Sequence, residues 1–401
     1  MPEKNLLVIS NNFPNQDNSN HGIFVKEQIK FLQVYFDKIY VFSPVAYGVE
    51  RLRKTTFQNY HYDNVMVFFP KYFNFPFLYY FGRSVWVFLA VKAIGSLIKK
   101  EMITFDLIHA HFTWPSGAIA VEIKNKNNVP LVITEHSSAT FHNAVHTNDR
   151  YWKNIFKNTD AIIRIRGGDV ALFESMDVPK DKIHVIPNGF DAGKFFLMPI
   201  IQCRDVLGLP VDKKILLNVG NLYPVKGHKF FIEAISRIVK VRQDILGIIV
   251  GSGDLEKQLR ELIEELHLSP YIRLVGSKPH AEIPLWMNAC DIFVLPSLNE
   301  GNPTVLFETL GCGKPFIGTR VGGVPEVIIS DEYGLLVQPA DSVELAEKIL
   351  LALNREWDRE NILRFAEQFT WEEIARKIRE VYSQVSAPDS GYTVKPEKKT
   401  S

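Results

Sequence analysis

The chain has 401 residues, of which 46% are hydrophobic and 23% are charged. These are the proportions of a folded globular protein, and they exclude wholesale disorder, collagen and coiled coil. With 46 Lys and Arg against 45 Asp and Glu, the net charge is +1, so no basic excess marks the chain as a nucleic-acid-binding protein.

Short apolar runs alternate with longer segments of helical period along most of the chain, a pattern typical of parallel α/β sheets. The length favours two domains at roughly 150 residues each. We therefore expect the α/β class with one open sheet per half. The predicted strands cover residues 6–10, 38–42, 65–69, 107–109, 131–134, 161–165 and 183–186 in the first half, and 215–219, 246–250, 272–275, 292–295, 315–318 and 334–337 in the second.

Both halves begin with a strand, a polar loop and a glycine that opens a helix, as in NLLVIS…HGIFVKEQIKFL and ILLNVGNLYPVKGHKFFIEAIS. Between them, the turn residues Pro187, Asn188 and Gly189 follow the last strand of the first half. We place the domain boundary at this turn. The parts of the chain are then an amino-terminal domain over 1–190, a second over 191–370, a terminal helix over 371–385 that packs back on the first domain, and a polar, disordered tail over 386–401.

The chain has three cysteines, Cys203, Cys290 and Cys312, with no CxxC pair. This argues against a disulfide scaffold or a thiolate zinc site and indicates a reducing compartment. The first apolar stretch is too short for a signal peptide, and no run of about eighteen apolar residues predicts a membrane-spanning helix. We expect a cytoplasmic protein, with the inner face of the cell membrane as its alternative place of action.

The stretch PSLNEGNPTVLFETLGCGKPFIG is the most informative in the chain. A strand precedes it, and a helix should begin near Pro303, because proline is tolerated in a first helical turn. Glu300 then lies in the loop and Glu308 in the helix, with the free amides of Thr304 and Val305 between them as an anion site. Such a segment could bind a hexose, a diphosphate and a ribose together. Alternatively, both acids are ordinary surface residues beside a helix start.

Three further loops follow strands of the second half. Gly322 and Gly323 form a bare-backbone turn at the carboxyl end of a strand, where open α/β sheets bind their ligands. Lys226 follows the half's first strand, a natural position for a charge on phosphate, and Gly251 and Gly253 form a third loop. Each loop alone is ordinary, but together they indicate one ligand site.

The chain resembles the retaining family 4 glycosyltransferases (glycosyl transferases group 1). The resemblance runs from about residue 6 to 385 and depends on the E-x7-E pattern EGNPTVLFE, supported by NVGNLYPVKG, IVGSGDLEKQL, GTRVGGVPEVI, VIPNGFD and HGIFVKEQ. It implies a GT-B fold, in which two Rossmann-like domains with parallel sheets face an interdomain cleft. The first domain would bind the acceptor and the second the nucleotide-sugar donor.

The resemblance also assigns roles. Glu308 would hold the donor ribose, Glu300 would contact the transferred sugar, and Lys226 would neutralise the diphosphate. Positive charge and amide dipoles would stabilise the leaving group, so no cofactor or metal ion is expected to be required. The expected catalytic residues are Glu300, His111 and Lys226. The expected donor-binding residues are Glu308, Gly22, Asn221, Gly251, Gly253, Gly301, Asn302, Thr304, Val305, Gly322 and Gly323.

The chain departs from the family pattern at two positions. Asn221 stands where the family usually has an arginine that pairs with Lys226 on the diphosphate; Arg320 or Lys229 could compensate for it. The paired glycines after the first strand are reduced to Gly22, because His21 takes the place of the other.

The segment DLIHAHFTWPSG resembles the one that brings a histidine to the family's cleft. His111 fits better than His109, because His111 follows the predicted strand whereas His109 lies within it. It would contact the donor sugar and position the acceptor. Alternatively, both are core histidines. His136 and Trp114 are weaker candidates for the acceptor side.

Residues 68–100 are rich in aromatic side chains, 11 of 33, and no acid occurs between Asn64 and Lys100. Aromatic and basic residues together suit the headgroup level of an anionic bilayer, where the protein could meet a lipid-linked acceptor. The alternative, slightly favoured, is a packed amphipathic helix with an aromatic loop lying on it.

The function expected from this resemblance is retaining transfer of a hexose from a nucleoside-diphosphate sugar to a glycan or lipid-linked acceptor, in cell-envelope or polysaccharide biosynthesis. The alternatives are a nucleotide-sugar epimerase or phosphorylase on the same frame, and a non-catalytic nucleotide-sugar binding protein, which Asn221 makes worth considering.

Overall fold

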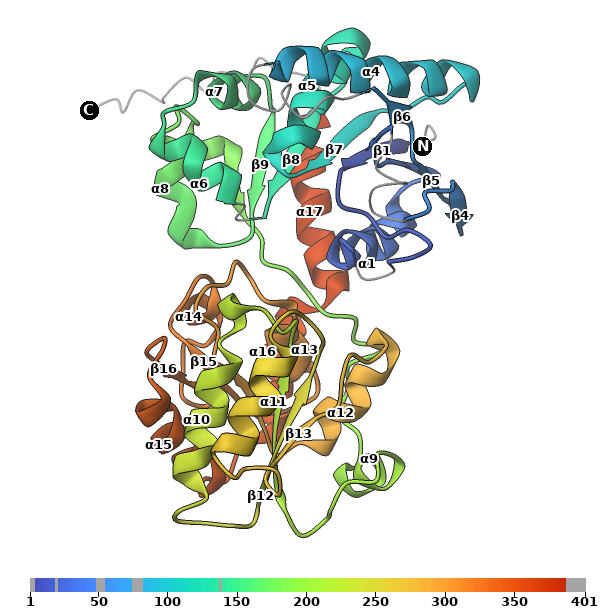
Figure 1. Cartoon of the computed structure of the whole chain (residues 1–401). Coiled ribbons are helices and arrows are strands. Elements are labelled where there is room, and N and C mark those ends of the chain that lie inside the picture. The colour runs from blue at the N-terminus through green and yellow to red at the C-terminus, as the bar shows by residue number, and fades with distance from the viewer. Residues whose placement is uncertain (1–3, 19–20, 48–54, 74–81, 137–138, 387–401) are drawn as a thin grey trace, which may run out of the picture.

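The computed structural model describes residues 4–18, 21–47, 55–73, 82–136 and 139–386. Two sheets organise these residues, one in each half of the chain (Figure 1). The expected α/β class with two parallel sheets is confirmed. The predicted tail lies outside the described residues, apart from its first residue, Ser386.

The amino-terminal sheet has eight strands in the order β10-β9-β8-β7-β1-β2-β5-β4, and every pair except β4 with β5 is parallel. Two short strands, β3 (Val45–Ala46) and β6 (Lys71–Tyr72), pair beside it. The sheet comprises β1 (Asn5–Ser10), β2 (Lys38–Phe42), β4 (Tyr60–Tyr62), β5 (Val65–Phe68), β7 (Leu107–His111), β8 (Leu131–Glu135), β9 (Ala161–Arg164) and β10 (Ile183–Val185).

The second sheet is wholly parallel, in the order β13-β12-β11-β14-β15-β16. It comprises β11 (Lys214–Val219), β12 (Ile245–Val250), β13 (Ile272–Leu274), β14 (Ile292–Leu295), β15 (Phe316–Thr319) and β16 (Gly334–Val337).

Each sheet reverses its strand order once, between β1 and β7 in the first and between β11 and β14 in the second. Doubly wound sheets bind ligands at such a reversal, outside the carboxyl ends of the strands, because the two flanking loops diverge there and leave a crevice. The loops after these four strands therefore bound the two expected binding regions.

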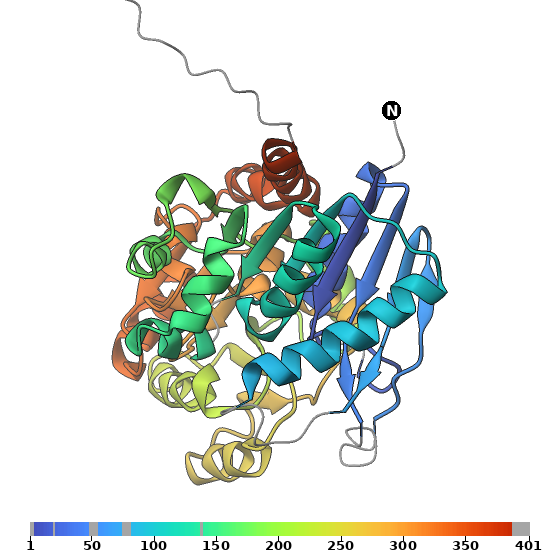
Figure 2. The same cartoon turned by 90° about the horizontal axis from the view of Figure 1, so that it is seen from above.

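Helices cover both faces of the amino-terminal sheet, which explains why β1 is buried along its whole length. Leu6 and Val8 face α1 (Ile23–Leu32) and α17 (Trp371–Ser386), whereas Leu7 and Ile9 face α4 (Arg83–Lys100) and α5 (Ala118–Asn127). Figure 2 shows α17 and α4 on opposite sides of the strands. The remaining helices here are α6 (Ala139–His146), α7 (Arg150–Lys157) and α8 (Val170–Glu174).

The second sheet is covered in the same way. One face packs against α10 (His228–Ile238), α11 (Glu256–Glu265) and α15 (Ser342–Leu353). The other packs against α9 (Ile200–Val206), α12 (Ile283–Ala289), α13 (Thr304–Gly311), α14 (Val324–Val327) and α16 (Arg359–Ala366). Within the described residues, no helix is both long and apolar enough to cross a membrane.

The chain passes between the two halves twice, and the two passages lie side by side. The Phe190 amide donates to the Phe369 carbonyl (3.0 Å), and the Trp371 amide donates to the Phe190 carbonyl (2.8 Å). After the second passage, α17 buries Ile374 and Ile378 against the amino-terminal sheet. The last helix therefore belongs to the first core, although it follows the second sheet in sequence.

Candidate active site

A charged pair joins the loops after the two central strands of the second sheet. Lys226 lies in the turn η5 (Pro224–Lys226) after β11, and Glu300 lies in the loop after β14. Lys226 Nζ is 2.7 Å from Glu300 Oε1, to which the Ser297 hydroxyl also donates (2.7 Å). Both partners bind the same carboxylate oxygen; among the described residues, Oε2 of Glu300 accepts no hydrogen bond. That oxygen is available to a hydrogen-bond donor of a ligand.

Glu308 lies in the second turn of α13, which begins at Thr304 as the sequence predicts. Its Oε1 is 3.0 Å from His280 Nε2, in the turn η6 (His280–Glu282). Burial alone would lower the pKa of His280, but the hydrogen bond and charge of Glu308 outweigh it, so the pKa is raised. The contact therefore stabilises the protonated form of His280 more than water would, and it orients one oxygen of Glu308.

Glu308 lines a pocket of about 110 Å³ to which both domains contribute. Thr304 and Val305, whose amides belong to the unpaired first turn of α13, line the same pocket. Phe24 and Glu27 of α1 close it from the amino-terminal side. The structure therefore places the carboxylate and the helix start in an interdomain crevice, where an anionic ligand can meet free amides.

The glycine pair after β15 allows two loops to touch. Gly322 has φ 54°, and a Cβ there would lie 1.8 Å from the carbonyl oxygen of Glu300. The Gly323 amide donates to the Gly301 carbonyl (2.8 Å). The glycines hold the loop of Glu300 in place through backbone contact, a structural role besides any contact with the donor.

Asn302 connects the same loop to the interdomain passage. Its Oδ1 accepts from the Asn188 amide (2.7 Å), and its carbonyl accepts from Asn188 Nδ2 (2.8 Å). Both side chains are buried. Asn302 was expected to bind the donor, but its amide oxygen is engaged in this contact between the domains.

The loop after β12 packs against the loop that carries Lys226. A Cβ on Gly251 would lie 1.9 Å from the Gly220 carbonyl oxygen, and one on Gly253 would lie 2.7 Å from that of Leu222. Asn221, which stands between Gly220 and Leu222, is exposed, and its carbonyl oxygen lies 2.9 Å from His228 Nε2. Arg320 and Lys229, the cations that could compensate for Asn221, are also exposed, and neither has an ion-pair partner in the described part of the chain.

The two histidines of β7 lie where the strand order of the first sheet reverses. The sequence argument that His111 follows this strand is wrong. β7 continues through His111, which pairs with Ser10 and Thr134, so both His109 and His111 lie within the strand. His109 is a satisfied core histidine: its Nε2 is 2.7 Å from Thr134 Oγ1 and its Nδ1 is 2.6 Å from Tyr382 Oη.

His111 and His136 form a pair instead. His111 Nδ1 lies 3.0 Å from His136 Nε2, and the rings are stacked with centroids 5.3 Å apart. Among the described residues, His111 Nε2 and His136 Nδ1 have no hydrogen-bond partner. Burial lowers the pKa of His136 to about 3 and that of His111 well below its usual value. The pair is therefore neutral, and its two unpaired nitrogens are buried.

Two phenylalanines that the sequence analysis did not identify hold His136 in place. The ring centroids of Phe24 and Phe112 lie 4.8 and 4.9 Å from that of His136. Phe112 has φ 70°, an uncommon conformation for a bulky residue that frequently marks functional sites. Because Phe24 also lines the pocket of Glu308, it connects that pocket with the histidine pair.

The other two predicted residues have packing roles. Trp114 is buried, with its ring 5.0 Å from that of Trp86. Gly22 begins α1 with φ 67°, and a Cβ there would lie 2.2 Å from the carbonyl oxygen of Asn12. Only glycine can start α1 so close to the loop after β1.

Glu326, which the sequence analysis did not identify, makes a contact between the two domains. Its carboxylate accepts from the backbone amides of Gly167 (2.6 Å) and Gly168 (2.8 Å), at the turn η3 (Gly167–Asp169) of the amino-terminal domain. Glu326 ends the motif GGVPE, but that motif does not indicate which residues of the other domain it contacts.

Comparisons with known proteins agree with this geometry. The model of Glycosyltransferase Family 4 matches residues 38–194, and that of Glycosyl transferases group 1 matches residues 200–369. An uncharacterized glycosyltransferase of Methanocaldococcus jannaschii is 31% identical over 337 residues, which are 82% of this chain and 88% of the relative. A D-inositol 3-phosphate glycosyltransferase of Corynebacterium urealyticum is 28% identical over 324 residues, 75% and 76% of the two chains.

Solved structures share the fold. Sucrose-phosphate synthase from Thermosynechococcus elongatus superposes with a TM-score of 0.74 at 21% identity, over 95% of this chain and 99% of that one. HepE of Anabaena in complex with UDP gives 0.73 at 22% identity, over 95% and 100%. The chain therefore belongs to the family 4 glycosyltransferases, the glycosyl transferases group 1, and has the GT-B fold.

Proposed function

We propose that this glycosyltransferase transfers a hexose, with retention of anomeric configuration, from a nucleoside-diphosphate sugar to a glycan or lipid-linked acceptor. The observation that carries the proposal is the position of Glu308 and of the free amides of α13 in a crevice lined by both domains. A carboxylate beside a helix start suits a ligand that has hydroxyls next to phosphates.

In this proposal each donor group has its own partner. Glu308, oriented by His280, accepts hydrogen bonds from the ribose hydroxyls, and the amides of Thr304 and Val305 receive the diphosphate. Lys226 moves its charge from Glu300 toward the departing phosphate as negative charge develops there, which stabilises the leaving group electrostatically. The carboxylate of Glu300 then accepts a hydroxyl of the transferred sugar. We propose that no metal ion or cofactor is required.

The acceptor enters from the amino-terminal domain. The unpartnered nitrogens of His111 and His136 are buried, and we propose that a shift of the neighbouring loops on ligand binding lets them hydrogen-bond the transferred sugar and orient the attacking hydroxyl. Their lowered pKa values make them hydrogen-bonding groups across the physiological range and weak bases.

A non-catalytic nucleotide-sugar binding protein is the second candidate, because exposed Asn221 leaves Lys226 without the cation that the family pattern predicts. One experiment separates the two candidates. The protein is incubated with radiolabelled UDP-, GDP- and ADP-hexoses together with neutral oligosaccharides or polyprenyl-phosphate-linked sugars, and products are analysed by NMR. Transfer with the donor's anomeric configuration supports the proposal. Isomerised donor without transfer would indicate an epimerase, and binding without any product would indicate the binding protein.

We further propose that the protein acts in the cytoplasm, in cell-envelope or polysaccharide synthesis, in peripheral contact with the membrane. Helix α4 packs Trp86, Ala90 and Ile94 into the core, as the alternative interpretation expects, but Val85 and Phe88 are 51% and 59% exposed. Part of the aromatic stretch, residues 74–81, lies outside the described residues. Co-sedimentation with anionic but not with zwitterionic vesicles, reduced in a Val85→Ser, Phe88→Ser variant, tests the contact.

A further inference from the structure

A pocket of about 380 Å³ lies in the second domain, at the end of the sheet opposite to the crevice of Glu308. Lys214, the first residue of β11, lines this pocket, whereas Val219, the last residue of the same strand, lines the crevice. A strand of six residues is about 20 Å long at 3.3 Å per residue. The pocket is therefore separate from the donor site, and the proposed function does not account for it.

Three cations line the pocket, Lys214, Arg355 and Arg359. Among the described residues, neither Arg355 nor Arg359 forms an ion pair or a side-chain hydrogen bond. Lys214 Nζ lies 3.8 Å from Asp291 Oδ1, which is too far for a hydrogen bond. All three side chains therefore keep their hydrogen-bond donors for a ligand.

Two acids also line the pocket, Asp291 and Glu356. The carboxylate of Asp291 is already compensated, because its Oδ2 accepts from Arg204 Nη2 and from the Ile215 amide, both at 2.7 Å. Arg204 is itself buried, with 4% of its side chain exposed. Glu356 is exposed and is the acid that remains against three cations. The lining thus carries an excess of positive charge.

A buried lysine next to the pocket adds to this excess. Lys314 directly precedes Pro315, which lines the pocket, and the lysine is fully buried. Its Nζ donates to two neutral groups, the carbonyls of Asn288 (2.7 Å) and Cys290 (3.0 Å). Burial lowers the pKa of Lys314, and the nearby charge of Arg359 also lowers it. A cation held away from water without an acid partner is costly, and an anion in the pocket would reduce that cost.

Trp357 fixes one wall of the pocket. Its indole N–H donates to the Ala352 carbonyl (2.9 Å), and the guanidinium of Arg355 lies over its ring, with Cζ 4.5 Å from the ring centroid. Contact with a fixed ring limits the orientations of the guanidinium, so less side-chain freedom is lost when a ligand binds. The volume is that of a small-molecule site and leaves room for a sugar beside a phosphate group.

We propose that this pocket is an anion site that binds a phosphate group, either as free phosphate or as the phosphate of a phosphorylated sugar. Each guanidinium offers a planar pair of N–H groups that matches two phosphate oxygens, and Lys214 adds a third charge. A cleft lined by an excess of one charge also raises the local concentration of ligands of the opposite charge. The inference does not rest on the proposed function, because the residues that carry it are not among those assigned to the donor or the acceptor.

Fluorine NMR of the full-length protein labelled with 5-fluorotryptophan tests the site locally. Of the six tryptophans, Trp357 lines this pocket and Trp371 lines the crevice of Glu308, and the variants Trp357→Phe and Trp371→Phe assign their resonances. The protein is titrated with glucose 6-phosphate, inorganic phosphate and glucose. We expect a saturable shift of the Trp357 resonance with glucose 6-phosphate and none with glucose. Tighter binding of glucose 6-phosphate than of inorganic phosphate would identify a sugar phosphate as the ligand, and equal affinities would identify phosphate itself.

Arg355→Gln and Arg359→Gln should each weaken binding of glucose 6-phosphate by roughly tenfold, since each removes a charged hydrogen-bonding group. Arg364→Gln is the matched control, because Arg364 is exposed on the same helix, α16, but does not line the pocket. It should bind like wild type. The inference is overturned if the Trp357 resonance does not move at millimolar glucose 6-phosphate, if glucose moves it equally, or if the double arginine variant binds like wild type. A phosphate-dependent shift of Trp371 without one of Trp357 also overturns it, because the anion then occupies the crevice of Glu308.

Discussion

Removing the carboxylate of Glu326 should loosen the closed arrangement of the two domains. Glu326 is an exposed residue of the second domain whose two oxygens each accept a backbone amide of Gly167 or Gly168 in the first. The variant Glu326→Ala removes both acceptors and leaves the folds of the individual domains unchanged, since neither core includes this side chain.

The size of the effect follows from the two bonds. Buried hydrogen bonds to a charged group contribute about 1.5–3 kcal/mol each, but an exposed carboxylate regains water when the bonds break, so about 0.5–1 kcal/mol each is the appropriate figure. Together they stabilise the closed arrangement by about 1–2 kcal/mol, and their loss should lower the ratio of closed to open molecules by roughly 5- to 30-fold.

Fluorescence energy transfer between the domains measures this ratio. The three native cysteines are buried, so cysteines introduced at Val34 and Val241, which are 74% and 71% exposed, can be labelled selectively. We expect a lower transfer efficiency in Glu326→Ala than in wild type, partly restored by saturating donor nucleotide. Glu347→Ala, an exposed change on α15, is the control. Equal efficiencies in wild type and Glu326→Ala would refute the assignment of Glu326 as an interdomain clamp.

Four further predictions concern charge at the site. Glu308→Gln should weaken donor nucleotide binding at least tenfold by calorimetry, and an unchanged affinity would remove the ribose assignment. Because the pKa of His280 is raised in the folded state, its ion pair contributes stability below about pH 6.5 that is lost as pH rises through the raised pKa; urea titrations should show this loss in wild type and not in Glu308→Gln. Lys226→Met should lower kcat at least a hundredfold and change the acceptor KM little. A rise in the acceptor KM as large as the fall in kcat would contradict the role of Lys226 at the leaving group. Burial lowers the pKa of His109 and His136 to about 3, so these histidines take up protons in the unfolded state first as pH falls below 6.5. The free energy of unfolding should therefore fall by about 1.4 kcal/mol per pH unit for each histidine. His136→Asn should reduce this slope, and equal slopes of stability against pH in wild type and variant would refute the assignment of His136 as neutral.

The donor half of the site was predictable because its signals are local. A proline and glycines between a strand and a helical segment fix where α13 begins, and so place Glu300 before it and Glu308 within it. Similarly, β1, β12 and β14 are largely apolar runs that are buried along their whole length. The strands that were missed, β3, β4 and β6, are two or three residues long, too short to show a period.

Contacts between distant segments left no such signal. The end of β7 was placed two residues early because polar histidines interrupt its apolar pattern, although His109 is satisfied by Tyr382, 273 residues away. The bonds of Asn302 and Glu326 to the other domain likewise join residues more than 100 positions apart. Each depends on how two separately folded cores meet, and a residue's type and neighbours do not encode that.

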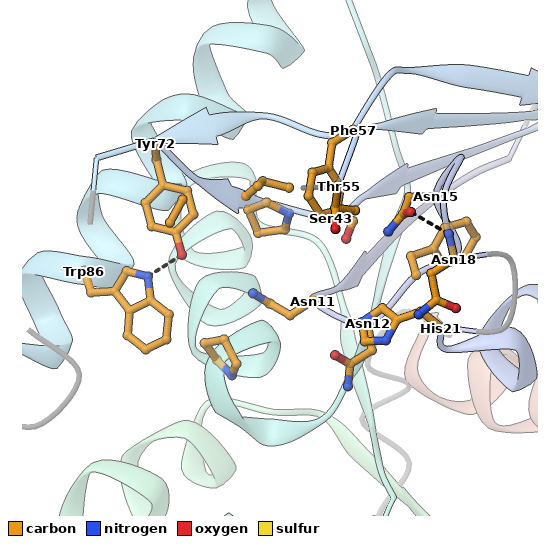
Figure 3. A pocket seen from close by; sticks show the side chains of 15 residues that line it. Asn11, Asn12, Asn15, Asn18, His21, Ser43, Thr55, Phe57, Tyr72 and Trp86 are labelled. Carbon is orange, nitrogen blue, oxygen red and sulfur yellow. Dashed lines mark hydrogen bonds between the residues drawn. The ribbon is translucent and has the colours of Figure 1, made fainter. Parts of the chain in front are cut away.

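Helix α1 is the element through which the two substrates can affect one another. His21, just before it, lines a pocket of about 520 Å³ within the amino-terminal domain (Figure 3), whereas Phe24 and Glu27 on its first two turns line the crevice of Glu308. Farther along, Lys30 Nζ pairs with Asp191 at the interdomain passage (2.7 Å), and Glu27 pairs with Lys194 (2.9 Å). Because α1 moves with the amino-terminal core, opening of the domains would separate Phe24 and Glu27 from Glu308. The residues proposed to hold the nucleotide lie in the second domain, so opening should weaken donor binding through the loss of the α1 side chains and should not abolish it.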